Sequence, residues 1–272
     1  FREDTDTNPN KTKGVVRVLV TGDSQVDGTV NNNESFPHVL ESKLNSGSQT
    51  TKFEFLNGGV GSYGPDQYFL FLNKYLFLDP DIYIICIYTG NDFMDSARIL
   101  EDKNGLNERP EEYFSSLRNC LMLSNGAINQ VANQIYYFKT FPQMREKSVK
   151  HALELIIKID NYCKQHNIDF ILVFLPTKAD VEWQSDGDVL EKVKNCLALS
   201  ESDLKINREL TQTLIQGVLR NNISFIDFYD PMKNKNVEFY WKKDYHLNNR
   251  AHSFIAEKIY EKYYSFFIRS KR

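Results

Sequence analysis

The chain has 272 residues, of which 41% are hydrophobic and 13% aromatic, and its formal net charge at pH 7 is -3. This hydrophobic content is enough for a substantial core, and α/β architectures of more than 200 residues often form one domain. The net charge and the absence of a long basic patch argue against nucleic acid as a partner. No stretch approaches 18 consecutive apolar residues, so the sequence predicts no transmembrane segment.

The chain begins at Phe1 rather than at an initiator methionine, and a polar segment follows up to Gly14. We expect residues 1–14 to form a polar N-terminal linker and residues 15–272 to form a single domain. We expect that an upstream segment, of which a signal or an anchor is an example, has been removed, so the absence of a signal peptide carries no information. The sequence itself leaves the compartment open, and such a removed segment favours a secreted or cell-envelope protein.

Strands and helices are expected to alternate along the rest of the chain. Apolar and β-branched runs predict strands at 15–21, 53–57, 82–88, 169–175 and 223–227. Helical spacing of apolar residues predicts helices over Phe36, Leu40 and Leu44; after Pro65, with Phe69, Leu72 and Leu76; over Leu153, Ile156, Ile157 and Cys163; at roughly 200–220; and over Ile255, Ile259 and Tyr263. This alternation predicts an α/β protein, a three-layer α/β/α sandwich around a parallel sheet of about five strands.

The longest excursion between predicted strands, at about 93–145, is expected to be an insertion. Its apolar residues at helical spacing fit either a hydrophobic lid for acyl chains or ordinary core packing; they are Tyr113, Leu117, Leu121, Ile128, Ile135 and Phe138. Three aromatic residues close to the expected site either shape the binding of an acceptor or simply pack; they are Tyr63, Phe93 and Tyr245.

Four polar motifs lie at the ends of predicted elements. Gly22-Asp23-Ser24 ends the first strand, residues 57–64 follow the second, Gly90-Asn91-Asp92 follows the third, and Asp244-Tyr245-His246 precedes the last helix. A serine hydroxyl becomes a useful nucleophile only with a base, an orienting carboxylate and donors for the oxyanion. Because the carboxyl ends of parallel strands share one edge, the four motifs are expected to meet there.

In this order and spacing, the four motifs resemble the sequence blocks of the SGNH hydrolases, also called GDSL esterases and lipases. The resemblance spans residues 18–252 and implies the flavodoxin-like fold of that family. It implies that Ser24 is the nucleophile, that His246 is the general base and that Asp244 orients it. It further implies an oxyanion hole formed by the Ser24 backbone N–H, a backbone N–H at Ser62 and the Asn91 side chain, with no metal and no cofactor.

Two departures concern the first and second blocks. Gln25 follows the nucleophile where leucine is frequent in the family, and we expect this difference to matter little. The glycine of the second block falls on Ser62, with Gly61 beside it. A backbone N–H survives any substitution except proline, so either residue could supply the second oxyanion donor.

The third departure concerns the acid. Asp244 lies two residues before His246, whereas the common pattern places the acid three residues before it, where Lys243 stands. This spacing resembles that of family members acting on acylated cell-envelope polysaccharides. Asp227 and Asp230 are alternative carboxylates, which we interpret as loop and capping residues.

The predicted function is serine-dependent hydrolysis of a carboxylic ester through an acyl-enzyme, on O-acylated carbohydrate or another small ester. The same residues would also serve an O-acyltransferase that moves the acyl group to a sugar hydroxyl. A non-catalytic binding domain of the same fold is the third alternative. The sequence does not indicate the oligomeric state.

The segment Gly59–Gly64 also fits the dinucleotide-binding pattern G-x-G-x-x-G. That pattern requires an acidic residue about 20 residues further on, at the end of the next strand. Here the next strand ends at Gly90-Asn91, and Asp79 and Asp81 precede it. We therefore interpret the glycines as a tight turn into the helix that begins at Pro65.

The four cysteines do not form a metal-binding pattern. Cys86 lies in an apolar strand, where it is expected to be a small buried hydrophobic residue. Cys120, Cys163 and Cys196 are widely spaced, and the absence of C-x-x-C or a histidine cluster argues against zinc. One disulfide among these three is compatible with the sequence, with the pairing left open.

Overall fold

The computed structural model describes residues 1–4, 6–47, 51–103, 109–124, 126, 128–182, 187–233 and 235–269. Its strands are β1 (Val15–Thr21), β2 (Lys52–Asn57), β3 (Ile82–Tyr88), β4 (Asp169–Leu175) and β5 (Phe225–Asp227). They form one sheet in the order β2-β1-β3-β4-β5, and every neighbouring pair is parallel. This is the strand order of flavodoxin-like folds, so the predicted fold class is confirmed.

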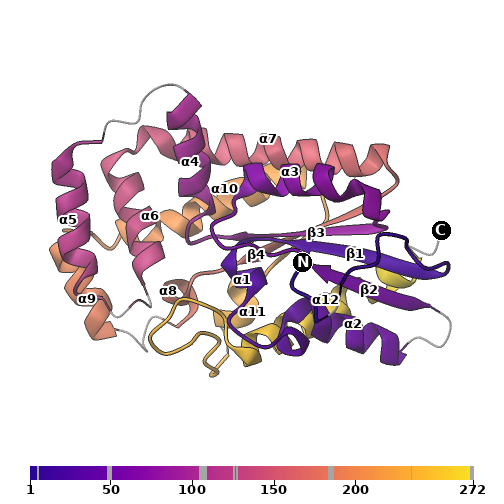
Figure 1. The fold of residues 1–272 in the computed structure, drawn as a ribbon. Helices are drawn as coiled ribbons and strands as arrows, with labels where there is room; N and C mark the ends of the chain where they lie inside the picture. Colours follow the sequence, from indigo (N-terminus) through magenta and orange to yellow (C-terminus); the bar gives the residue numbers. More distant parts are fainter. Residues whose placement is uncertain are drawn as a thin grey trace.

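Helices cover both faces of the sheet (Figure 1). The helices described are α1 (Ser24–Asp27), α2 (Phe36–Gly47), α3 (Pro65–Tyr75), α4 (Asp92–Lys103), α5 (Glu111–Leu121), α6 (Asn129–Thr140), α7 (Gln143–Gln165), α8 (Lys178–Val181), α9 (Gly187–Cys196), α10 (Ile206–Arg220), α11 (Tyr229–Lys233) and α12 (Asn249–Arg269). Short 3₁₀ turns lie at η1 (Asn32–Glu34), η2 (Leu76–Leu78) and η4 (Asp203–Lys205).

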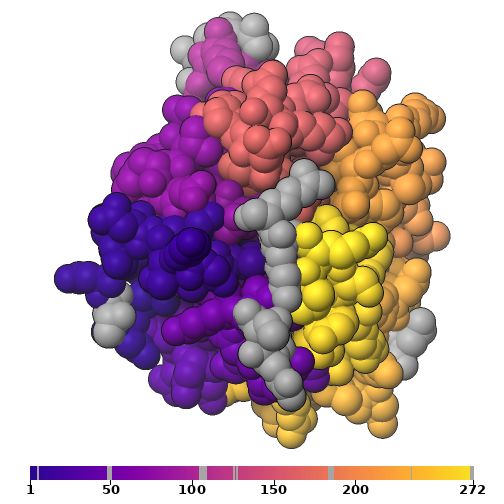
Figure 2. All heavy atoms as spheres, turned by 90° about the vertical axis from the view of Figure 1, so that its right-hand side faces the viewer, coloured from indigo at the N-terminus to yellow at the C-terminus, as the bar shows by residue number. Residues whose placement is uncertain are grey.

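Alternate strand residues face two separate cores. Leu19 and Ile85 pack with α3, α7 and α10 on one face, whereas Val18 and Ile84 pack with α2 and α12 on the other. The amino-terminal edge of the sheet faces the viewer in Figure 2, where α7 (salmon) and α12 (yellow) reach the surface. The carboxyl-terminal edge, at the other end, carries α1 and the predicted site.

The excursion after β3 is part of the core. It forms α4, α5, α6 and the start of α7, and the residues considered as a lid are mostly buried there: Tyr113, Leu117, Ile128, Ile135 and Phe138. Phe93 is fully buried in the same core. These residues therefore belong to the core, as the second of the two interpretations given above expects, and do not form a lid.

Strand β5 is shorter than the predicted strand 223–227. The backbone N–H of Ile223 donates to Val218 O at the end of α10, so this residue closes the helix instead of joining the sheet. Phe225, Ile226 and Asp227 pair with β4, and Ser224 O, just before them, accepts the Leu172 N–H at 3.0 Å.

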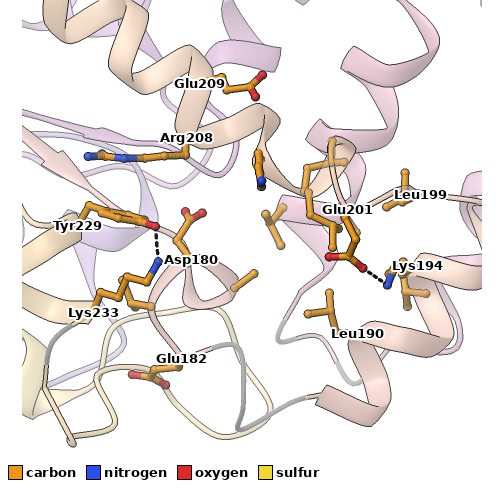
Figure 3. Close-up of a pocket in the computed structure, with 18 of the residues that line it drawn as sticks. Asp180, Glu182, Leu190, Lys194, Leu199, Glu201, Arg208, Glu209, Tyr229 and Lys233 are labelled. Carbon is orange, nitrogen blue, oxygen red and sulfur yellow. Dashed lines mark hydrogen bonds and ion pairs between the residues drawn. The ribbon is translucent and has the colours of Figure 1, made fainter.

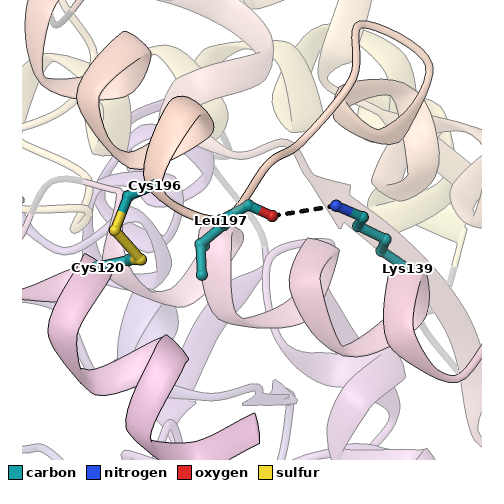
Figure 4. Close-up of a disulfide and its surroundings, with 4 residues drawn as sticks. All are labelled: Cys120, Lys139, Cys196 and Leu197. Carbon is teal, nitrogen blue, oxygen red and sulfur yellow. Dashed lines mark hydrogen bonds between the residues drawn. A yellow bond between two sulfur atoms is a disulfide. The ribbon is translucent and has the colours of Figure 1, made fainter. Parts of the chain in front are cut away.

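The open question of cysteine pairing is answered by a disulfide between Cys120 of α5 and Cys196 at the end of α9 (Figure 4). Lys139 of α6 adds a hydrogen bond to Leu197 O at 3.0 Å beside it. Cys86 and Cys163 are free and buried. Burial raises the pKa of the Cys163 thiol to about 12, so this thiol is unreactive in the folded protein.

The first four residues, within the expected linker, contact the carboxyl-terminal edge. The Arg2 backbone N–H donates to Asn57 O at 2.8 Å, and its guanidinium donates to Gly28 O at 3.0 Å and to Asp27 O. Glu3 accepts a hydrogen bond from the Asn57 N–H at 2.9 Å. The segment thus connects the end of α1 with the end of β2. No helix among the described residues has the length and apolar character needed to cross a bilayer.

A buried histidine should make stability depend on pH. His252 is fully buried in α12, its Nδ1 accepts a hydrogen bond from Phe36 N–H at 3.1 Å, and its Nε2 has no partner among the described residues. Burial lowers its pKa to about 4, and the Arg2 charge contributes. The unfolded chain therefore binds more protons between about pH 4 and the ordinary histidine pKa near 6.5.

We expect the free energy of unfolding to fall as the pH is lowered from about 6.5 to 4, by up to roughly 3 kcal/mol from this residue. Denaturant titrations at pH 7, 5.5 and 4.5 would measure it. His252→Phe should lack this share of the pH dependence, whereas an unchanged pH dependence in the variant would contradict the assignment.

Candidate active site

Three predicted residues form a continuous hydrogen-bonded chain. Ser24 Oγ lies 2.9 Å from His246 Nε2, and His246 Nδ1 lies 2.7 Å from Asp244 Oδ1. The same Asp244 oxygen accepts the His246 backbone N–H at 3.0 Å. With the Nδ1 proton donated to Asp244, the Nε2 atom is free to accept the serine proton. The side chain of His246 is only 14% exposed, whereas that of Asp244 is 45% exposed.

The turn between β1 and α1 presents the serine. Asp23 caps α1, because its side chain accepts the Gln25 backbone N–H at 2.8 Å. Gly22 packs so closely on the next elements that a Cβ there would lie 2.4 Å from Val26 Cγ2 and 3.2 Å from Cys86 Cβ. The glycine therefore lets the chain turn at once from strand to helix, and Ser24 becomes the first residue of α1.

Three buried carboxyl groups lie close together behind the serine. Burial raises the pKa of Asp23 to about 7 despite its hydrogen bond from Gln25, and Asp95 adds to the rise. Burial raises the pKa of Asp95 to about 6 against the lowering effect of Arg98. The pKa of Asp92 is also raised by burial, with the Asp23 charge contributing. Near neutral pH the cluster therefore carries less negative charge than three ordinary aspartates, which suits a neighbouring oxyanion.

Asn91 follows β3 and is 6% exposed. Its Nδ2 donates one hydrogen to Asp95 Oδ2 at 3.2 Å, and a hydrogen bond from Asn91 also acts to lower the pKa of Asp23. Its Oδ1 is buried and has no partner among the described atoms. Asp95, which sequence reasoning did not single out, thus fixes the orientation of the amide.

The loop after β2 leaves two backbone donors unused. The N–H groups of Gly58 and Val60 donate to Val20 O at 2.7 Å and to Gly22 O at 3.1 Å, and that of Gly59 donates to the Asn57 side chain at 3.1 Å. Over the described part of the chain, no hydrogen bond uses the N–H of the next two residues, Gly61 and Ser62.

Ser62 has a φ of +66°, a left-handed conformation that glycine adopts most easily. Gly59 serves packing, because a Cβ there would lie 2.1 Å from Asp27 N. Among the glycines that imitate a dinucleotide-binding pattern, Gly59 is thus required by its contact with α1, whereas a Cβ at Gly61 would meet no atom within 4 Å. The assignment of the second oxyanion donor to Ser62 stays a prediction.

The remaining predicted residues have structural surroundings. Asp227 pairs with Arg208 at 2.8 Å and accepts the Tyr229 N–H at 3.0 Å, which agrees with its interpretation as a capping residue. Lys243 is exposed. The Tyr245 ring lies beside the His246 ring, with 4.3 Å between their centroids.

A cavity with a volume of about 870 Å³ lies away from Ser24, Asp244 and His246, none of which lines it. It lies among α8, α9, α10 and α11, where Arg208 stacks 3.9 Å above the Tyr229 ring and Lys194 pairs with Glu201 (Figure 3). A second cavity of about 550 Å³ borders residues 58–61. Among the described residues, no cluster of histidine, cysteine, aspartate and glutamate could hold a metal ion.

No protein-family model matches the chain, and no curated protein matches it in sequence. Solved structures do match. The acetyl xylan esterase AlAXEase is 14% identical, with a TM-score of 0.53 over 91% of this chain and 99% of that one. A catalytic mutant of the acetylxylan esterase Axe2 from Geobacillus stearothermophilus is 11% identical, with a TM-score of 0.53 over 91% and 93%.

The psychrotrophic esterase EstA from Pseudoalteromonas sp. is 12% identical, with a TM-score of 0.51 over 92% of this chain and 97% of that one. At these identities the likeness concerns the fold. It extends over nearly the whole of each chain, so the sheet and its surrounding helices are those of the esterases named here.

Proposed function

We propose that this protein is a serine-dependent ester hydrolase that works through an acyl-enzyme at Ser24. The observation that carries the proposal is the hydrogen-bonded chain from Ser24 through His246 to Asp244, at 2.9 and 2.7 Å. Chance neighbours would rarely align nucleophile, base and acid in this order at the carboxyl edge of the sheet. The shared fold with esterases supports the same conclusion.

In the first step, His246 Nε2 takes the hydroxyl proton as Ser24 Oγ attacks the ester carbonyl carbon. The negative charge on the carbonyl oxygen is stabilised by the Ser24 backbone N–H, the Asn91 amide and a backbone N–H at Ser62. His246 then gives its proton to the departing alcohol. In the second step, His246 deprotonates a water molecule that attacks the acyl-serine and releases the acid.

We propose O-acylated carbohydrate as the substrate class. The partly exposed Ser24 and the half-exposed Asp244 leave the site open toward solvent, which suits an acyl group on a long chain. Two of the similar structures are named acetylxylan esterases. The spacing of Asp244 and His246 adds support, because it resembles that of family members acting on acylated polysaccharides.

Two measurements test the proposal. The wild type should release p-nitrophenol from acetyl esters faster than from octanoyl esters, and should release acetate from acetylated polysaccharide. Diethyl p-nitrophenyl phosphate should add one phosphoryl group, located by mass spectrometry on the peptide with Ser24. If the phosphate reagent labels Ser24 but no ester is hydrolysed, the result would favour an acyltransferase that needs a sugar acceptor. If Ser24 is not labelled, the result would favour a binding domain.

Asp244 is expected to contribute less to kcat than the carboxylate of a buried triad does. Removing a buried triad carboxylate costs about 10⁴ in kcat. Because the Asp244 side chain is 45% exposed, water screens its charge and can partly replace it. We therefore expect Asp244→Ala to lower kcat by about 10 to 10²-fold. Kinetics on p-nitrophenyl acetate would measure this, with the exposed Asp230→Ala as control. Equal activities of the two variants would contradict the role of Asp244.

We also propose that the protein works in an oxidising compartment such as the cell envelope. The Cys120–Cys196 disulfide supports this, because such bonds persist mainly outside the reducing cytosol. Protein denatured during extraction from its native source in the presence of an alkylating reagent should have two thiols that react, those of Cys86 and Cys163. Four free thiols would contradict the proposal.

A further inference from the structure

Gln25 directly follows the nucleophile and is fully buried. Its side-chain Nε2 donates to Tyr245 O at 3.1 Å, and its Oε1 accepts the Leu247 backbone N–H at 3.1 Å. These two backbone groups belong to the residues on either side of His246. One amide therefore holds the base-carrying loop from both sides, although about 220 residues separate the partners in sequence.

The two contacts lie on either side of the bend that carries His246: the C=O of Tyr245 precedes the base and the N–H of Leu247 follows it. The Gln25 amide provides the matching acceptor and donor. On the rest of the loop, Trp241 N–H donates to His246 O at 3.1 Å and Asn248 N–H donates to Phe239 O at 2.9 Å.

The other end of Gln25 is equally fixed. Its backbone N–H is bound by Asp23 at 2.8 Å, and Ser24 lies between these two residues. The distance of 2.9 Å between Ser24 Oγ and His246 Nε2 is thus set by a short rigid link from the turn of the nucleophile to the loop of the base. A leucine at this position would fill the space but leave Tyr245 O and Leu247 N–H unpaired.

We propose that Gln25 is a positioning residue that sets the distance and angle between Ser24 and His246. The inference rests on the proposed ester hydrolysis and adds to it a residue outside the triad and the oxyanion hole. It departs from the sequence-based expectation that the replacement of leucine by Gln25 matters little, and the tests below decide between the two.

The first test compares Gln25→Leu with Asn45→Leu. Asn45 of α2 makes the same pair of bonds, to Phe53 O at 3.0 Å and from Phe53 N–H at 2.8 Å, at the opposite edge of the sheet. Both variants lose an amide bound to backbone at two points. Gln25→Leu should lower kcat for p-nitrophenyl acetate by about 10 to 100-fold with KM within about twofold, because small displacements of reacting groups are costly. Asn45→Leu should keep the wild-type kcat.

Gln25→Glu provides a second test with nearly the same shape. When it is protonated, this buried carboxyl has one donor and one acceptor, as the amide does. When it is ionised, it has no hydrogen to donate to Tyr245 O, and that hydrogen bond is lost. The charged or titratable groups around it are Asp23, Asp244, Tyr245 and His246. Relative to the wild type, the activity of Gln25→Glu should therefore decline as the pH rises from 6 to 9.

The outcomes separate the two proposals. If the wild type hydrolyses no ester, the proposed ester hydrolysis is overturned. The NMR signal of the proton on His246 Nδ1, which appears downfield, would then still test whether Gln25 holds His246 in place. This signal should be sharp in the wild type and Asn45→Leu and broadened in Gln25→Leu. An active wild type with an unchanged kcat in Gln25→Leu, or the same NMR signal in all three proteins, would overturn the positioning role. Should Gln25→Leu not fold, the pH profile of Gln25→Glu decides, and a profile parallel to that of the wild type would overturn the role.

Discussion

Replacing Ser24 with alanine is expected to lower kcat for ester hydrolysis by about 10⁴ to 10⁶-fold, as in other enzymes that lose the nucleophile of a triad. The variant lacks the oxygen that forms the acyl-enzyme, so only the oxyanion donors and substrate binding would still assist attack by water. His246→Ala should lose a similar factor, because the serine hydroxyl is then left without a base 2.9 Å away. The double variant should be hardly worse than either single one, since the two residues act together.

Initial rates on p-nitrophenyl acetate would measure these effects, with circular dichroism to verify folding. Ser46→Ala is a suitable control, because Ser46 is an exposed serine far from His246 in the fold, and its hydroxyl donates to Lys43 O of its own helix. A folded Ser24→Ala variant with more than about a hundredth of the wild-type kcat would assign the nucleophile elsewhere.

Replacing Asn91 with alanine is expected to lower kcat by about 10² to 10³-fold, which is the typical effect of removing one oxyanion donor. The Asn91 amide would stabilise the oxyanion, while KM should change little. Asn91→Asp should lose more than Asn91→Ala. It places a carboxylate beside the developing negative charge and next to the buried Asp23 and Asp95.

Steady-state kinetics of both Asn91 variants would test this assignment. Asn45→Ala is the appropriate control, because it also removes an amide with two hydrogen bonds, at the far edge of the sheet. If Asn91→Ala retained the wild-type kcat, the amide would have no part in stabilising the oxyanion.

The sheet and its order of elements could be predicted because each strand is a local signal. Ile82–Tyr88 is a continuous apolar run, and Val15–Thr21 is apolar or β-branched except at Arg17. Each neighbouring strand pairs with them in parallel, as helical connections between strands require. The same locality explains why Ser24 and Asn91 could be found. Each follows such a run directly, at the edge where parallel sheets carry their sites.

The contacts that could not be predicted depend on residues far apart in sequence. The bonds of Gln25 to the loop of His246 form only once β1 and α12 are in place, and no local pattern marks them. The choice of Cys196 as the partner of Cys120 follows from the packing of α5 on α9. The hydrogen bond between Asp95 and Asn91 could be recognised only in the three-dimensional structure, although Asp95 lies only one helical turn after Asn91.

The attachment of the first residues to the active edge has a practical consequence for work with recombinant protein. Phe1 and Arg2 border the cavity beside residues 58–61. An affinity tag fused before Phe1 would therefore emerge next to this cavity, and for the proposed polymeric substrate it would be an obstacle at this edge of the sheet. Helix α12 starts beside the site and runs away from it over 21 residues, or about 30 Å. A tag after this helix would leave the site free, so activity on polysaccharide should be measured with that fusion.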